Sequence, residues 1–174
     1  MGSEPQLAVG MWVAMMAVMM APGSAAAASR TPQKASFLAV YLGTWVAFGV
    51  AAAGLQYFLE THQLLTERMA LESGATAGIL LIVIGAYQLT TWKHACLQAC
   101  RTAQTEAKRY SLGCLGACWA LMGVLFVVGV MNLAWIAVLA AWIAAEKTLA
   151  WGGALASVAG IGFIIWGGLK LLVV

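Results

Sequence analysis

The stretch LGCLGACWALMGVLFVVGVMNLAWIAVLAAWIAA, residues 112–145, decides how this chain must fold. None of its 34 residues carries a charged side chain. One continuous helix of this length would measure about 51 Å, whereas the hydrocarbon core of a membrane is only about 30 Å thick. Gly129 and Asn132 interrupt the run and mark a break in the helix. We therefore predict two helices that cross a membrane in opposite directions, over residues 112–130 and 132–146.

The rest of the chain repeats this apolar character. Hydrophobic residues make up 63% of the 174-residue chain, charged residues only 9%, and the mean hydropathy is +0.91. Soluble domains usually contain about a quarter charged residues, so the composition indicates an integral membrane protein. Four further runs have the length of about 20 residues that a transmembrane helix needs, over residues 7–28, 36–59, 74–92 and 150–172. We predict a single all-α domain over residues 1–174, a polytopic transmembrane helix bundle of about six spans.

The distribution of Lys and Arg predicts how this bundle is oriented. If six spans alternate in direction, Arg68 and Lys170 lie on one face and the other seven basic residues lie on the opposite face. Those seven are Arg30, Lys34, Lys93, Arg101, Lys108, Arg109 and Lys147. Because Lys and Arg concentrate on the cytoplasmic side, we expect a multi-pass membrane protein with the cysteine-bearing loop in the cytoplasm.

The same charges indicate which partners to expect. They are separated by apolar runs and form no patch that could bind a phosphate backbone, so nucleic-acid binding is excluded. The expected partners are membrane lipids and either other membrane protein subunits or further copies of this chain. Glycines in the last two long runs predict close helix packing, at Gly113, Gly116, Gly123 and Gly129 and at Gly160, Gly162, Gly167 and Gly168.

All four cysteines lie in two copies of a CxxxC motif, CLQAC at Cys96 and Cys100 and CLGAC at Cys114 and Cys118. Residues four apart on a helix face the same direction, with Cβ atoms about 5–6 Å apart. Four thiolates are soft ligands that suit Cu(I), Zn(II) or an iron–sulfur centre. Two alternatives to metal binding remain. A buried Cys can be a small apolar filler, and the cysteines could form disulfides, which are less expected on a reducing cytoplasmic face.

His94 is close enough in sequence to complete the site, although a His at a membrane interface is more often solvated.

A second group of sulfur atoms lies in the first apolar run, in MWVAMMAVMMAP. On a helix, Met11, Met15 and Met19 form one ridge, and Met16 and Met20 form an adjacent ridge. Thioethers bind Cu(I) and few other biologically abundant ions, so the spacing favours copper. The alternative is that these methionines only fill space in the helix packing.

Glu146 is the acidic residue that ends the long apolar run. It is a candidate metal ligand or proton acceptor, and the alternative is a simple ion pair with Lys147.

Several of these motifs occur together in the order AMMxxMMxP, YQLTxxKxxCLxxC, GCLGxCWALM and FVxGVMNLxW, followed by a late EK. In this succession the chain resembles the bacterial family of predicted metal-binding integral membrane proteins of unknown function. The resemblance implies a helical fold in the bacterial inner membrane and a metal site whose metal is not established. It points to Met15, Met16, Met19 and Met20, and to Cys96, Cys100, Cys114 and Cys118. The chain departs from the family pattern at His94, where a basic Arg is expected.

No catalytic constellation competes with metal binding. The sequence has no Ser-His-Asp set, HExxH motif, phosphate-binding glycine loop with a Lys, or paired carboxylates in a predicted pocket, so an enzyme function is not expected. We predict an integral membrane protein that binds a soft metal ion in metal handling or delivery, with Cu(I) favoured and zinc second. One alternative is a structural or assembly subunit of a larger membrane metalloenzyme complex. The other is a membrane thiol–disulfide redox protein, which is less favoured because redox pairs usually have CxxC spacing.

Overall fold

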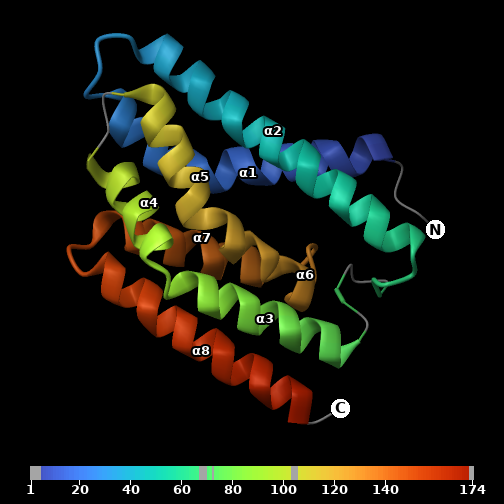
Figure 1. The fold of residues 1–174 in the computed structure, drawn as a ribbon. Helices are drawn as coiled ribbons and strands as arrows, with labels where there is room; N and C mark the ends of the chain where they lie inside the picture. Colours follow the sequence, from blue (N-terminus) through green and yellow to red (C-terminus); the bar gives the residue numbers. More distant parts are fainter. Residues whose placement is uncertain (1–4, 67–69, 72, 103–105, 173–174) are drawn as a thin grey trace.

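The computed structural model describes residues 5–66, 70–71, 73–102 and 106–172. Within these residues the regular structure is helical, apart from one isolated β-bridge between Leu65 and Leu71. The helices are α1 (Pro5–Ala28), α2 (Lys34–Thr61), α3 (Gly74–Gln88), α4 (Thr91–Thr102), α5 (Ala107–Gly123), α6 (Leu125–Val128), α7 (Leu133–Thr148) and α8 (Gly152–Leu172) (Figure 1). The predicted all-α fold is confirmed.

The long apolar run breaks where the sequence predicts. The helical segment of α5 and α6 ends at Gly129, whose φ of 97° is accessible to glycine at little cost. Asn132 then caps α7, because its side-chain oxygen accepts a hydrogen bond from the backbone N–H of Trp135 at 3.4 Å. Figure 1 shows the chain turning back at α6 into α7.

The number of membrane-crossing helices is lower than predicted in the part of the chain described. Three helical segments are long and apolar enough to cross a membrane, namely α2, the continuous segment Ala107–Val128 and α8. The predicted span 74–92 is divided instead into α3 and α4, which bend by 62° and together make a fourth candidate. The helix α1 runs over 24 residues, and Gln6–Ala21 within it is an apolar helix. The helix α7 has 16 residues, fewer than the about 20 that a span needs. About six spans are therefore not confirmed.

Close glycine contacts hold α3 against α8. A Cβ added at Gly85 would come within 2.6 Å of the Gly160 carbonyl oxygen, and one added at Gly167 within 2.6 Å of the Gly78 carbonyl oxygen. The two backbones therefore touch with no room for a side chain between them. The predicted close packing is confirmed at Gly160 and Gly167, whereas a Cβ at Gly162 would meet nothing within 4 Å.

The helices α4 and α5 form an antiparallel hairpin at the centre of the bundle. A Cβ at Gly113 would lie 2.9 Å from the backbone nitrogen of Cys100, and one at Gly116 would lie 2.5 Å from the sulfur of Cys96. On its other sides α5 packs against α2, and α7 contacts α1, α4 and α8. The helix α4, which carries two of the cysteines, therefore contacts both α5 and α7, and the methionine-rich α1 contacts α7.

The connections between helices separate into two ends. Figure 1 shows the α1–α2 and α7–α8 connections at one end of the bundle, together with the end of α4 and the start of α5. The start of α1, the end of α2, the start of α3 and the end of α8 lie at the opposite end. This agrees with one basic face, although Arg68 lies outside the described residues. One correction is needed, because Lys93 belongs to α4, is fully buried and is not a loop charge. Which end faces the cytoplasm stays a prediction.

Large apolar side chains such as Val18, Leu133 and Leu172 remain 75–83% exposed on the outside, as expected of helices that contact lipid.

Candidate metal centre

A cavity of about 460 Å³ lies between α1, α4, α5 and α7 and brings both predicted groups of sulfur residues together. Met19, Met20 and Cys100 contribute to its wall. We call it the sulfur cavity. Most of the remaining wall is apolar and comes from α7, at Ile136, Ala137, Ala140, Ala141, Ile143 and Ala144. Its charged lining consists of Arg101 and Lys147.

The methionines of α1 differ in their position relative to this cavity. Met16 and Met20 are almost fully buried, Met19 is 8% exposed, and Met15 is half-buried against the core. Met19 and Met20 line the sulfur cavity, whereas Met15 and Met16 are not among its lining residues. The Tyr41 hydroxyl donates a hydrogen bond to the Met20 carbonyl at 3.3 Å, which fixes this turn of α1 against α2.

A disulfide joins the two CxxxC motifs. It connects Cys100 of α4 to Cys114 of α5, whose Cα atoms are 4.9 Å apart. A disulfide is less expected from the sequence than metal ligation, because the predicted orientation places these cysteines on a reducing cytoplasmic face. Spacing also does not show which helices meet. Tight packing of α4 on Gly113 brings these two cysteines together.

The other two cysteines are free thiols and lie elsewhere on the hairpin. Cys96 is half-buried, with its sulfur packed against Gly116, and Cys118 is 1% exposed. Among the described residues, no three His, Cys, Asp or Glu side chains gather closely enough to hold a metal ion. The structure therefore brings together two of the four predicted thiol ligands, and these two are bonded to each other.

His94 is not part of the sulfur cavity. A Cβ added at Gly153 of α8 would lie 3.4 Å from its Nδ1 atom, so the imidazole lies against the start of α8. His94 and Cys96 are close in sequence but face different neighbours, because residues two apart on a helix point in different directions.

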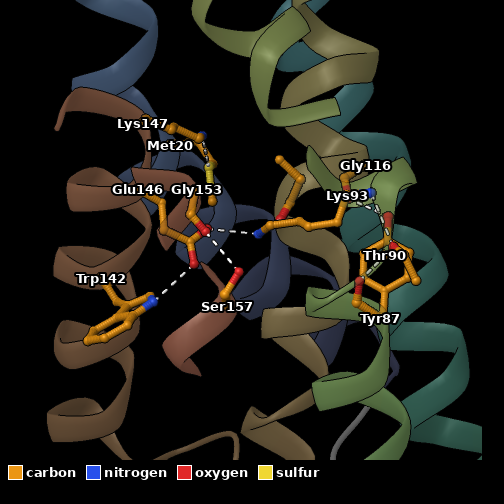
Figure 2. Close-up of polar contacts among 11 residues, drawn as sticks. Met20, Tyr87, Thr90, Lys93, Gly116, Trp142, Glu146, Lys147, Gly153 and Ser157 are labelled. Atoms are coloured by element: carbon orange, nitrogen blue, oxygen red, sulfur yellow. Dashed lines mark hydrogen bonds and ion pairs between the residues drawn. The ribbon is translucent and has the colours of Figure 1, made fainter. Parts of the chain in front are cut away.

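Glu146 forms a buried ion pair. Its Oε2 lies 2.8 Å from the Nζ of Lys93, and the two side chains are 1% and 0% exposed. Lys93 also donates a hydrogen bond to the Ala117 carbonyl, and the Trp142 indole N–H donates to Glu146 Oε1 at 3.0 Å (Figure 2). We call these four groups the polar joint, because they connect α4, α5 and α7. The partner of Glu146 is therefore Lys93, and not Lys147 as the sequence analysis considered.

Lys147, the next residue on α7, faces the sulfur cavity. Its Nζ donates a hydrogen bond to the sulfur of Met20 at 3.6 Å (Figure 2). In the described part of the chain the ion pairs are Lys93–Glu146 and Arg109–Glu106, and neither includes Lys147 or Arg101. Two unneutralised cations thus line the cavity that contains the sulfur atoms.

Neither the buried position of Lys93 nor the presence of two cations in the cavity is predicted from the sequence. A signal existed for Lys93, because Lys93, Leu97 and Cys100 are spaced i, i+4 and i+7 and form the buried stripe of α4. No comparable local pattern distinguishes Lys147, whose contact with Met20 joins residues 127 positions apart.

Comparison with known proteins adds one finding to this geometry. A family model described as PpoB2, copper chaperone, matches residues 9–170. The matched region contains all of the methionines and cysteines of the candidate site, and it agrees with the predicted resemblance to a metal-related family. Neither a curated protein nor a solved structure matches the chain.

Proposed function

The chain belongs to the PpoB2 copper chaperone family, and on this premise we propose that it is an integral membrane protein that binds Cu(I) as cargo and passes it on. The proposed binding site is the sulfur cavity. The proposed setting is the bacterial inner membrane, with the cavity near the cytoplasmic face, and it is supported by the apolar helices and by the basic residues at one end.

The observation that carries the proposal is that Met19, Met20 and Cys100 line one cavity. Thioethers and thiolates are soft ligands and prefer Cu(I) to harder ions. Zinc, which the cysteines alone would also suit, gains little from the two methionines. Among the described residues that line this cavity none carries a carboxylate, so its chemistry favours Cu(I).

Copper binding requires the Cys100–Cys114 disulfide to open. An external dithiol supplies two electrons and two protons, becomes a disulfide itself, and leaves Cys100 and Cys114 as thiols. Each thiol then loses a proton when it binds Cu(I), because the thiolate is the metal ligand. The oxidised chain lacks these ligands, so copper handling by this site depends on the state of the disulfide.

The arrangement suits the transfer of an ion from weak to strong ligands. Neutral thioethers exchange readily, whereas thiolates hold Cu(I) more tightly. Met15 and Met16 precede Met19 and Met20 by one helical turn, and we propose that they pass the ion toward the cavity. Cys96 and Cys118 lie on the same hairpin as the disulfide and are proposed to receive it afterwards, before delivery to a partner protein in the membrane.

Cu(I) titration of the purified, detergent-solubilised protein tests the proposal. The protein is reduced with a dithiol under anaerobic conditions, and Cu(I) affinity is measured by competition with a chromogenic chelator. We expect the wild type to bind Cu(I), the Cys100→Ser/Cys114→Ser variant to bind at least about a hundredfold more weakly, and Met19→Leu/Met20→Leu to lose about tenfold.

Met122→Leu provides the matched control. Met122 is 1% exposed, but it lines a different and wholly apolar cavity next to α3. This variant should bind Cu(I) like the wild type. If the cysteine and methionine variants also retain wild-type affinity, copper is not bound in the sulfur cavity and the proposal is wrong.

The Cys100–Cys114 disulfide also favours a second function, a membrane thiol–disulfide redox protein. In that case the reduced protein would transfer two electrons to a disulfide substrate without copper. Its activity would be lost in Cys100→Ser but would be unchanged in Met19→Leu/Met20→Leu, which separates the two functions.

A further inference from the structure

The sulfur cavity carries positive charges although its proposed cargo is a cation. Lys147 lies 3.6 Å from the sulfur of Met20, and Arg101 lines the same cavity. A Cu(I) ion held only by neutral thioethers would keep its charge of +1 beside these two side chains. The interaction would be repulsive, because like charges a few ångströms apart destabilise each other.

The neighbouring polar joint shows how the same fold neutralises a buried lysine. Glu146 pairs with Lys93 at 2.8 Å, and both are almost completely buried. Lys147 follows Glu146 directly, but no carboxylate of the described chain lies within ion-pair distance of it. The sulfur cavity is therefore the place in this part of the bundle where positive charge remains available to a ligand.

The charge of the bound copper depends on which sulfur atoms hold it. When Cu(I) binds two thiols, two S–H bonds break, two Cu–S bonds form, and two protons leave to solvent. The product, a Cu(I) bis-thiolate, carries a net charge of −1. Lys147 and Arg101 would stabilise this anion, whereas they would destabilise a cationic thioether complex.

We propose that Lys147 and Arg101 are specificity-determining residues that select copper as an anionic Cu(I) bis-thiolate held by Cys100 and Cys114. This inference rests on the proposed function and deepens it. It assigns the two thiolates to the stable copper state and the two methionines to the exchange step. It also explains why two positively charged side chains line a site that binds a positively charged metal ion.

The test compares Cu(I) dissociation constants of dithiol-reduced variants at a fixed pH. Lys147→Gln, which removes the charge, should bind Cu(I) at least about tenfold more weakly than the wild type. Lys147→Arg, which keeps the charge, should recover most of the affinity. Lys108→Gln is the control, because Lys108 is exposed and does not line the cavity, and it should change affinity less than about twofold.

A second arm distinguishes charge selection from a structural role. In the Cys96→Ser/Cys100→Ser/Cys114→Ser/Cys118→Ser background no thiolate remains and the copper held by the methionines is cationic, so Lys147→Gln should leave affinity equal or make it stronger. A purely structural effect would weaken binding in both backgrounds. If Lys147→Gln fails to fold, Arg101→Gln, at a half-buried position, serves in both arms.

Two results would overturn the inference. One is equal affinity of Lys147→Gln and the wild type, and the other is the same loss in both backgrounds. Failure of the proposed function would look different, because the wild type would then bind Cu(I) no better than Cys100→Ser/Cys114→Ser. X-ray absorption on the copper-loaded wild type provides an independent readout, with two short Cu–S bonds expected.

Discussion

The polar joint and the sulfur cavity lie on two sides of the same turn of α7, and they differ in how their charged side chains are paired. The joint contains a buried ion pair, whereas the described cations of the cavity have no carboxylate partner. Glu146 faces the joint, where Lys93 and the Trp142 indole N–H donate to its two carboxylate oxygens, and the Ala117 carbonyl accepts a further hydrogen bond from Lys93. Lys147 faces the cavity, where its described partner is a methionine sulfur. The Glu146–Lys93 pair is neutralised within the fold and stabilises helix packing. The charge of Lys147 has no such partner among the described residues, so it can interact with a bound ligand.

The largest effect should come from breaking the polar joint. Glu146→Gln leaves the buried Lys93 ammonium without a counter-charge, and we expect a loss of about 3–5 kcal/mol in the free energy of unfolding. Chemical unfolding in detergent micelles measures this loss. Copper affinity per folded molecule should stay within about twofold, because the joint does not line the sulfur cavity.

Two controls sharpen this prediction. Glu106→Gln removes the carboxylate of a pair whose side chains are 64–65% exposed, and stability should barely change. Lys93→Met/Glu146→Leu removes both buried charges and should recover most of the stability lost in Glu146→Gln. A double variant as unstable as the single one would show that the joint does more than neutralise charge.

The next effect concerns the disulfide beside the sulfur cavity. Reduction of Cys100–Cys114, which closes a loop of 14 residues, should lower the free energy of unfolding by up to about 3 kcal/mol. Cu(I) at a hundred times its dissociation constant should restore about 2.7 kcal/mol, because it binds the folded state. Thermal unfolding of the oxidised, reduced and copper-loaded protein checks this. Absence of stabilisation by copper would contradict binding at the cavity.

A smaller effect is expected away from both regions, at the α3–α8 contact. Gly85→Ala places a methyl group 2.6 Å from the Gly160 carbonyl oxygen, and overpacking of this kind costs about 1–3 kcal/mol. Gly162→Ala is the matched control on α8, where the added Cβ meets nothing within 4 Å and stability should hold or rise slightly. Chemical unfolding curves measure the change in stability of both variants. A parallel Cu(I) titration should show that their copper affinity is unchanged.

The smallest effect should come from the methionines outside the cavity. Met15→Leu/Met16→Leu conserves volume and apolarity, so each change should cost less than about 1.5 kcal/mol. The equilibrium affinity for Cu(I) should be retained, while copper loading of the cysteines in membrane vesicles should slow. Stopped-flow measurement of Cu–S absorbance gives the loading rate. If the double variant loads copper as fast as the wild type, these methionines contribute only to helix packing.

Much of the fold was predictable because it depends on local chemistry. Composition and apolar runs predicted an all-helical chain, and Gly129 and Asn132 predicted the break before α7. The predicted span 74–92 failed at one point, because α3 ends at Gln88 and the chain bends before α4. Beyond the bend, α4 packs on α5, and this contact between helices cannot be read from a local pattern.

The sequence by itself determined which residues share a helix face. It placed Met15 with Met19 and Met16 with Met20 on α1, and it placed each CxxxC pair on one side of its helix. These relations follow from 3.6 residues per turn and do not depend on neighbouring helices.

Only the tertiary structure decided which faces meet. The Cys100–Cys114 disulfide, the Lys93–Glu146 pair and the Lys147–Met20 contact join residues 14, 53 and 127 positions apart. Each depends on the rotation and approach of packed helices, which are fixed by close contacts at glycines such as Gly113. Local spacing contains no information on that rotation, so the sulfur cavity and its two cations exist only once α1, α4, α5 and α7 have packed together.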